Sequence, residues 1–237
     1  MTTLQLVMLT MSVILVNAYS NTNQRISSKS LPINSCCDLR KYSAPSGMYT
    51  MSMGTFGTLY VYCDMTTADG GWIVIQRNKK RSSFIFDRNW SEYEYGFGRL
   101  TNEFWYGLKL MHFLTQTGHW EIRVDYTNRK GYHGPPFYIH YNQFKVGNAS
   151  EQYKLTIGGY IGGDGDYFNG GDQPVNNRSF STFDNDNDLS ESNCALVAKS
   201  GWWFNACDDI NPNRQPPLPY KSDSDITEMK IRPKACI

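Results

Sequence analysis

The chain contains 237 residues, of which 14% are aromatic and 19% are charged, and its 23 basic and 22 acidic side chains leave a formal net charge of +1. A near-neutral chain has no general attraction to nucleic acid or to an anionic membrane surface, so both are excluded as general partners, although a charged local site is not. The high content of Trp, Tyr and Phe argues against intrinsic disorder and predicts a folded globule of one large domain or two small ones.

The N-terminus has the pattern of an export signal. Residues 4–16 are largely apolar, no charge occurs before Arg25, and Val16 and Ala18 place small or branched side chains at the −3 and −1 positions of a cleavage site. We therefore expect a signal peptide over residues 1–18 and a secreted, extracellular protein; a buried N-terminal helix is the alternative. The apolar span is too short to cross a membrane and no longer one follows, so no membrane span is expected.

A flexible lead-in is predicted over residues 19–34, which are rich in Ser, Asn and Thr, and a folded domain is predicted over 35–237. Three runs within that domain have the composition of strands: residues 59–62, 72–75 and 120–126. The third run alternates strictly between apolar and polar side chains, which indicates a strand with one face in water.

A short amphipathic helix is predicted between these strands. Phe104, Leu108 and Met111 have helical spacing, and Thr101 or Asn102 would cap the N-terminus of this helix. Paired glycines mark turns in the segments that follow. The whole pattern predicts an α+β fold with many loops, in which most tryptophans lie in the core.

Six cysteines occur, and export would allow them to form disulfides. Cys36 and Cys37 are adjacent and are not expected to bond to each other. Cys194 and Cys207 would close a short loop, which the chain-entropy model values at about 3 kcal/mol. The two other cysteines, Cys63 and Cys236, would then pair with the adjacent residues. No paired C-x-x-C unit occurs, so a zinc site is not predicted.

Three Asn-x-Ser sequons begin at Asn89, Asn148 and Asn177. In an exported protein they are candidate N-glycosylation sites at the surface. They carry no information about activity.

The segment between Tyr160 and Ser192 is acidic, because it contains seven carboxylate side chains and a single basic residue, Arg178. Its sharpest feature is the alternation of Asp and Asn over residues 184–188, because alternate carboxylates on a short loop can converge on one hard cation. An EF-hand would need Gly and Glu where this chain has Leu189 and Ala195, so it is not an EF-hand. Spacing alone supports a Ca²⁺ site and an acidic turn equally.

No enzyme is predicted. The chain has four histidines, which belong to no catalytic motif: His112, His119, His133 and His140. Asp164 and Asp166 could form a glycosidase pair, but carboxylates in a Gly-rich loop are usually solvated or bind cations.

A series of short motifs occurs along the chain in a fixed order: Tyr62-Cys63-Asp64-Met65, Asp69-Gly70-Gly71-Trp72, Gly96-Phe97-Gly98, Glu103-Phe104-Trp105, residues 180–188, Asn193-Cys194-Ala195, residues 201–207 and residues 229–233. Together they resemble the fibrinogen C-terminal domain of fibrinogen chains, ficolins, tachylectins and angiopoietins, over roughly residues 35 to 235. The resemblance implies a secreted α+β globule with a mainly antiparallel central sheet, short helices and a loop-rich calcium and ligand region.

The resemblance also implies a Ca²⁺ site. By position its ligands are the carboxylates of Asp186 and Asp188 and the backbone carbonyls of Ser190 and Ser192. The ion would be structural and would stiffen the loop that leads to Cys194.

The disulfides that the resemblance implies are Cys194–Cys207 and a bond from Cys63 to either Cys36 or Cys37. Cys236 would then bond to the remaining member of the adjacent pair, or to a second chain, which would make covalent oligomers.

The ligand pocket is where this chain departs from the lectin-like members, which bind an acetyl group beside the second disulfide. The corresponding residues are Phe204, Ala206, Cys207 and Asp208, with Phe204 at a position where Tyr is usual and Asp208 where His is usual. A Pro-rich stretch, residues 216–219, stands where the family has further pocket aromatics.

The expected function is that of a secreted, calcium-stabilised, fibrinogen-related lectin that binds acetylated or other glycans in innate recognition. The alternative is a protein-binding or extracellular-matrix adhesion module without sugar specificity. The expected partners are glycans or extracellular and cell-surface proteins, and homo-oligomer formation is left open.

Overall fold

The computed structural model describes residues 33–54, 57–79, 85–128, 137–170, 173–207, 210–214 and 224–236. The predicted signal peptide and nearly all of the predicted lead-in lie outside these ranges. The chain divides into two compact units, one up to Ile73 and one from Val74.

The first unit is a hairpin with a 3-10 helix. Strands β1 (Gly47–Ser52) and β2 (Thr58–Asp64) pair in antiparallel register, and η1 (Cys36–Tyr42) precedes them. A capping box between Ser35 and Asp38 starts η1. The unit is too small for a large core, and a disulfide between Cys36 and Cys63 ties η1 to β2.

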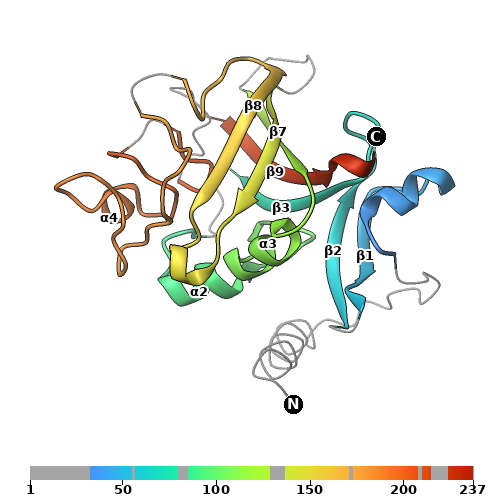
Figure 1. Ribbon diagram of the computed structural model, residues 1–237, viewed down its shortest axis with the longest axis horizontal. Helices are drawn as coiled ribbons and strands as arrows, with labels where there is room; N and C mark the ends of the chain where they lie inside the picture. The colour runs from blue at the N-terminus through green and yellow to red at the C-terminus, as the bar shows by residue number, and fades with distance from the viewer. Residues whose placement is uncertain are drawn as a thin grey trace. The chain divides into compact units, whose positions relative to one another are not determined.

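The second unit is built on a mainly antiparallel sheet in the order β3-β9-β6-β7-β8 (Figure 1). Its strands are β3 (Trp72–Lys79), β6 (Trp120–Asn128), β7 (Phe137–Val146), β8 (Leu155–Gly163) and β9 (Ser224–Pro233). The β6–β9, β6–β7 and β7–β8 pairs are antiparallel. Two short strands, β4 (Phe97–Gly98) and β5 (Phe104–Trp105), pair with each other, and β5 also pairs with β3. The expected α+β fold with a mainly antiparallel sheet is confirmed.

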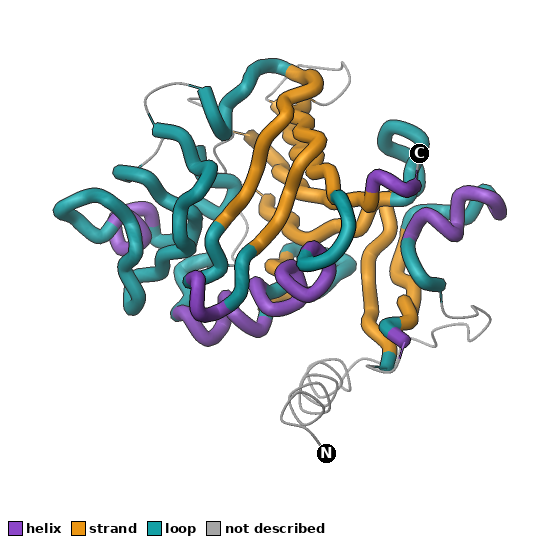
Figure 2. The backbone as a smooth tube through the Cα atoms, viewed as in Figure 1, coloured by secondary structure: helices purple, strands orange, loops and turns teal. Residues whose placement is uncertain are grey.

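Short helices complete this unit: α2 (Trp90–Tyr95), α3 (Leu108–Thr115), η3 (Ala149–Glu151), α4 (Cys194–Ala198) and η4 (Lys234–Cys236). Helices α2 and α3 contact each other, and α3 also packs against β7. Loops form most of the chain between β8 and β9, with α4 as a short helix among them (Figure 2). No helix of the described residues is long and apolar enough to cross a membrane.

The prediction that the amphipathic helix includes Phe104 was wrong. Phe104 lies in β5, where it pairs with Gly98 and with Arg77, and the helix begins only at Leu108. Gly107 precedes the helix with φ 98°, and a Cβ atom there would lie 2.8 Å from the main chain of Tyr95. Sheet pairing and this tight backbone approach therefore outweigh the helical spacing of the apolar residues.

The core of the second unit is aromatic. Tyr93, Trp105, Phe180 and Trp203 are each at most 1% exposed, and their ring centroids lie between 5.0 and 5.9 Å from their neighbours. Aromatic pairs at these distances contribute energy beyond the area that they bury. This cluster supports the loops that follow β8.

Candidate functional site

The candidate site is built on two loop segments that lie side by side. Ser181 and Trp202 exchange backbone hydrogen bonds of 2.9 and 3.1 Å, and the amide of Leu189 donates to the carbonyl of Asn205 at 2.7 Å. A disulfide between Cys194 and Cys207 closes the region. These cross-links hold residues 181–207 as one loop assembly, which we call the acidic loop region.

Buried hydrogen bonds connect the acidic loop region to Tyr153 and, through Asn213, to strand β3. Trp203 is fully buried and donates from its indole nitrogen to the carbonyl of Tyr153 at 2.8 Å. The side chain of Asn213 donates to the carbonyl of Gly201 at 2.9 Å and accepts a hydrogen bond from Gln76 of β3 at 3.1 Å. Buried hydrogen bonds of this kind are costly to break, so the base of the region is fixed.

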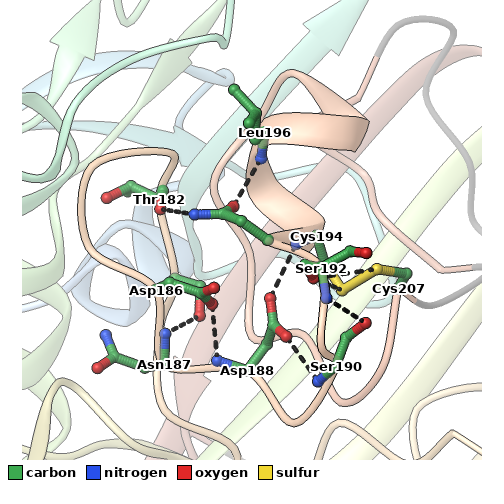
Figure 3. Close-up of a disulfide and its surroundings, with 11 residues drawn as sticks. Thr182, Asp186, Asn187, Asp188, Ser190, Ser192, Cys194, Leu196 and Cys207 are labelled. Carbon is green, nitrogen blue, oxygen red and sulfur yellow. Dashed lines mark hydrogen bonds between the residues drawn. A yellow bond between two sulfur atoms is a disulfide. The ribbon is translucent and has the colours of Figure 1, made fainter.

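Asp188 organises the turn of the acidic loop region (Figure 3). Its two carboxylate oxygens accept hydrogen bonds from the amides of Ser190 at 2.8 Å and Cys194 at 2.9 Å. Its own amide donates to the carboxylate of Asp186 at 3.2 Å. The alternation of Asp along the segment thus folds the chain back through successive side-chain to main-chain hydrogen bonds.

Negative charge accumulates at this turn. Burial raises the pKa of the Asp188 carboxyl, hydrogen bonds from Cys194 and Ser190 lower it, and the neighbouring Asp186 raises it again, so that the pKa lies above its usual range. Within the part of the chain that the structure describes, no Lys, Arg or His forms an ion pair with either carboxylate. No cationic side chain of the described residues therefore balances this pair of carboxylates.

The remaining predicted ligands are main-chain oxygens. The carbonyl oxygen of Ser192 lies 3.6 and 3.8 Å from the disulfide sulfurs of Cys194 and Cys207, and no N–H or O–H group of the described residues donates to it or to the carbonyl oxygen of Ser190. Two carboxylates and two carbonyls form an all-oxygen donor set, which is the type that Ca²⁺ prefers. No cluster of three or more His, Cys, Asp or Glu residues that could hold a metal occurs among the described residues, so a cation here would depend on main-chain oxygens.

The predicted ligand-binding residues differ in their access to solvent. The Phe204 side chain is only 1% exposed, Ala206 is half-buried and Cys207 is exposed, with φ at 56°. Asp208 lies outside the described residues. Of these residues, Ala206 and Cys207 are the ones that a ligand could reach on the described surface.

The acidic loop region also exposes apolar side chains that none of the sequence motifs indicates. Leu189, Leu196 and Val197 are 66%, 62% and 70% exposed, and Phe183 is 40% exposed. Large apolar residues within an acidic loop are the signal that could have indicated them, because such loops are otherwise polar. They give the acidic loop region an apolar as well as an acidic surface.

The cysteines are all oxidised in the structure. Cys36 pairs with Cys63 and Cys194 pairs with Cys207, which resolves the choice between Cys36 and Cys37 as the partner of Cys63. Cys37 and Cys236 are also disulfide-bonded. No free cysteine occurs among the described residues.

The three sequon asparagines occupy different positions. Asn89 is half-buried at the N-cap of α2, Asn148 is exposed at the N-cap of η3, and Asn177 is exposed with φ at 63°.

The chain is similar in sequence and in structure to several known proteins. Fibrinogen-like protein A of Apostichopus parvimensis is 40% identical over 176 residues, which are 73% of this chain and 60% of that protein. The fibrinogen-like globe domain of human ANGPTL6 superposes with a TM-score of 0.76 at 30% identity, over 88% of this chain and 98% of that structure. A lamprey fibrin D-dimer, complexed with the peptide Gly-His-Arg-Pro-amide, matches with a TM-score of 0.76 at 25% identity, over 96% of this chain and 83% of that one.

The family model described as the C-terminal globular domain of fibrinogen beta and gamma chains matches residues 34–234. This range holds the aromatic core, the acidic loop region and all but one of the cysteines. The chain therefore belongs to the fibrinogen C-terminal domain family.

Proposed function

We propose that this chain is an extracellular, non-enzymatic recognition module in which Ca²⁺ stabilises the acidic loop region and glycans bind beside the Cys194–Cys207 disulfide. The observation that carries the proposal is the pair of carboxylates of Asp186 and Asp188, which no cationic side chain of the described residues balances. Membership of the fibrinogen C-terminal domain family supports a binding role.

The residues of the acidic loop region have different roles in this proposal. Asp186 and Asp188 would hold the ion together with the carbonyls of Ser190 and Ser192, and Asp188 also fixes the turn through the amides of Ser190 and Cys194. Bound Ca²⁺ supplies positive charge that offsets the repulsion between the carboxylates. A rigid loop loses less conformational entropy when a ligand binds, which favours affinity.

The ion site can be tested with Asp186→Asn. The amide oxygen of Asn can still accept the hydrogen bond from the Asp188 amide, so the variant removes charge with little change of shape. We expect Ca²⁺ to raise the melting temperature of the wild-type protein and to have a much smaller effect on the variant, because only the folded loop binds the ion.

The matched control is Glu191→Gln, an exposed carboxylate of the same loop that is not among the proposed ligands. It should keep the full response to Ca²⁺. An equal response in all three proteins would contradict the ion site.

Glycan binding is tested by retention on immobilised N-acetylglucosamine with Ca²⁺ or with chelator. The proposal predicts retention in Ca²⁺ that free N-acetylglucosamine or the chelator reverses. If the folded protein is not retained on the column and also binds nothing on a glycan array, a glycan is not the ligand. The proposal of a recognition module would then require a different ligand.

A protein ligand is the second candidate, and the exposed apolar residues favour it. Leu189, Leu196 and Val197 offer aliphatic surface, which suits protein contacts better than hydroxyl-rich sugars. The lamprey relative is described in complex with a short peptide. If this candidate is right, Leu196→Ser should weaken adhesion to an extracellular protein substrate and leave any binding to N-acetylglucosamine resin unchanged.

A further inference from the structure

We propose that the turn between β7 and β8 is a modification site, at which the side-chain nitrogen of Asn148 carries an N-linked glycan in preference to Asn89 and Asn177. The inference rests on the export of the chain, which is part of the proposed function, and goes beyond it by assigning the site.

Exposure separates the sequons. Residues 148–152 are all exposed, so the whole Asn148 sequon and the two residues after it face solvent. In the other two sequons part of the motif is half-buried: Asn89 and Trp90 in one, Arg178 and Ser179 in the other. A bulky, hydrated glycan needs a surface position, and only the Asn148 sequon provides one along its full length.

The hydrogen bonds of Asn148 leave its reactive atom free. Its Oδ1 accepts from the amide of Glu151 at 3.1 Å and from the hydroxyl of Ser150 at 2.6 Å, and its amide donates to the Glu151 carboxylate at 3.0 Å. Its Nδ2 has no hydrogen-bond partner among the described residues. The capping box of η3 therefore uses the oxygen of the side chain and leaves the nitrogen to solvent.

The modification is compatible with this cap. A bond forms between Nδ2 and the anomeric carbon of a lipid-pyrophosphate-linked oligosaccharide, the bond from that carbon to the pyrophosphate oxygen breaks, and Nδ2 gives up one proton. Oδ1 stays a carbonyl-type acceptor, so both hydrogen bonds that it accepts persist in the glycosylated protein.

Asn89 is a poorer position because its sequon is held against the core. The ring of Trp90 lies 6.0 Å from that of Tyr153 and 6.3 Å from that of Phe180, and its amide donates to Asp184 at 2.9 Å. A glycan on half-buried Asn89 would start beside this packed contact. The half-buried position therefore leaves less room for a glycan than exposed Asn148 does.

Asn177 is exposed, but its sequon runs along the edge of β8. The Asn177 amide donates to the carbonyl of Leu155 at 2.8 Å, and the Leu155 amide donates to the carbonyl of Arg178 at 2.9 Å. The sequon then leads directly into Phe180, which is fully buried. Its hydroxyl residue, Ser179, is accordingly half-buried, in contrast to Ser150.

The test is site occupancy in the exported protein. The chain is produced in a eukaryotic secretory cell behind a foreign signal peptide, so the result does not depend on residues 1–18. Peptide mass spectrometry after glycan removal by a peptide-N-glycosidase in ¹⁸O water then counts modified and unmodified Asn at each sequon. We expect the highest occupancy at Asn148 and little or none at Asn89.

Matched variants separate the sequon from the cap. Asn148→Asp keeps an oxygen that can cap η3 but cannot be glycosylated, and Ser150→Ala removes the hydroxyl that the sequon requires; both should abolish the modification at this site. Ser150→Thr should retain it. Secreted protein with an unmodified Asn148, or with higher occupancy at Asn89 or Asn177, would overturn the proposal, whatever the outcome of the ligand-binding experiments.

Discussion

Glu121 forms a buried ion pair with Arg232 and also contacts His140. Its side chain is only 3% exposed, and its two oxygens lie 2.6 Å from Nε of Arg232 and 2.8 Å from Nε2 of His140. Burial alone would raise the pKa of this carboxyl, but the hydrogen bonds and charges of His140 and Arg232 outweigh burial and bring its pKa below the usual range.

Glu121→Gln should therefore destabilise the domain at neutral pH by about 3–5 kcal/mol, because it removes a buried negative charge that pairs with Arg232. Urea unfolding at pH 7 measures this loss. The exposed carboxylate variant Glu191→Gln should stay within about 0.5 kcal/mol of wild type.

The same carboxyl makes stability depend on pH. A carboxyl whose pKa is lower in the folded than in the unfolded state stabilises the fold above the unfolded pKa of about 4.3, and this contribution disappears as the pH falls through the folded pKa. The stability gap between wild type and Glu121→Gln should therefore narrow in urea titrations below about pH 4. A gap that is constant from pH 7 to pH 3 would contradict this account.

The segment 210–214 shows how an element without regular structure is fixed. The carbonyl of Pro212 accepts hydrogen bonds from the side chains of Gln76 at 3.0 Å and Asn78 at 2.9 Å, both fully buried on β3. Asn213 connects the same segment to Gly201 of the acidic loop region. A strand thus positions a loop through side-chain amides.

Asn213→Ala should cost about 1–3 kcal/mol, because the buried carbonyl of Gly201 loses the hydrogen bond from Asn213 and Gln76 loses one of its acceptors. It should also speed backbone hydrogen exchange in residues 200–207 more than in β6 and β7. The control Asn102→Ala, at an exposed asparagine, should change neither measurement appreciably. Uniform acceleration across the sheet would indicate global destabilisation instead.

The Cys194–Cys207 disulfide closes the acidic loop region and should stabilise it. Replacing both cysteines by Ser should lower the free energy of unfolding by about 2–4 kcal/mol, as expected for a short closed loop. The melting-temperature gain from Ca²⁺ should also shrink, because the proposed ligands lie on the loop that this bond closes. An unaltered gain would mean that the loop is ordered without the disulfide.

For the molecule as a whole, local motifs predicted the fold better than they predicted the surface. The ordered motifs indicated the α+β fold, since the aromatic residues in them, such as Trp105 and Trp203, are those that pack into the core. The spacing of apolar residues could not predict where the helix begins, because Phe104 lies in a strand. It pairs there with Gly98 and with Arg77, and these pairings depend on the tertiary fold.

Side-chain access was the least predictable property. Phe204 was expected to contact a ligand and is buried, whereas Leu196 and Val197 project from α4 into solvent. Periodicity cannot decide this on a helix as short as Cys194–Ala198, because it has no complete apolar face. The choice between Cys36 and Cys37 likewise depends on which side of η1 meets β2, a tertiary property.

The position of β9 in the sheet has a consequence for synthesis on the ribosome. β9 lies between β3 and β6, and its register pairs Ile231 with Ile122, a residue made more than 100 positions earlier. Until β9 has emerged from the ribosome, the edge of β6 that pairs with it is open, and contacts of such long sequence separation form slowly. The nascent chain therefore cannot complete the pairing of β6 with β9 while the acidic loop region is being translated.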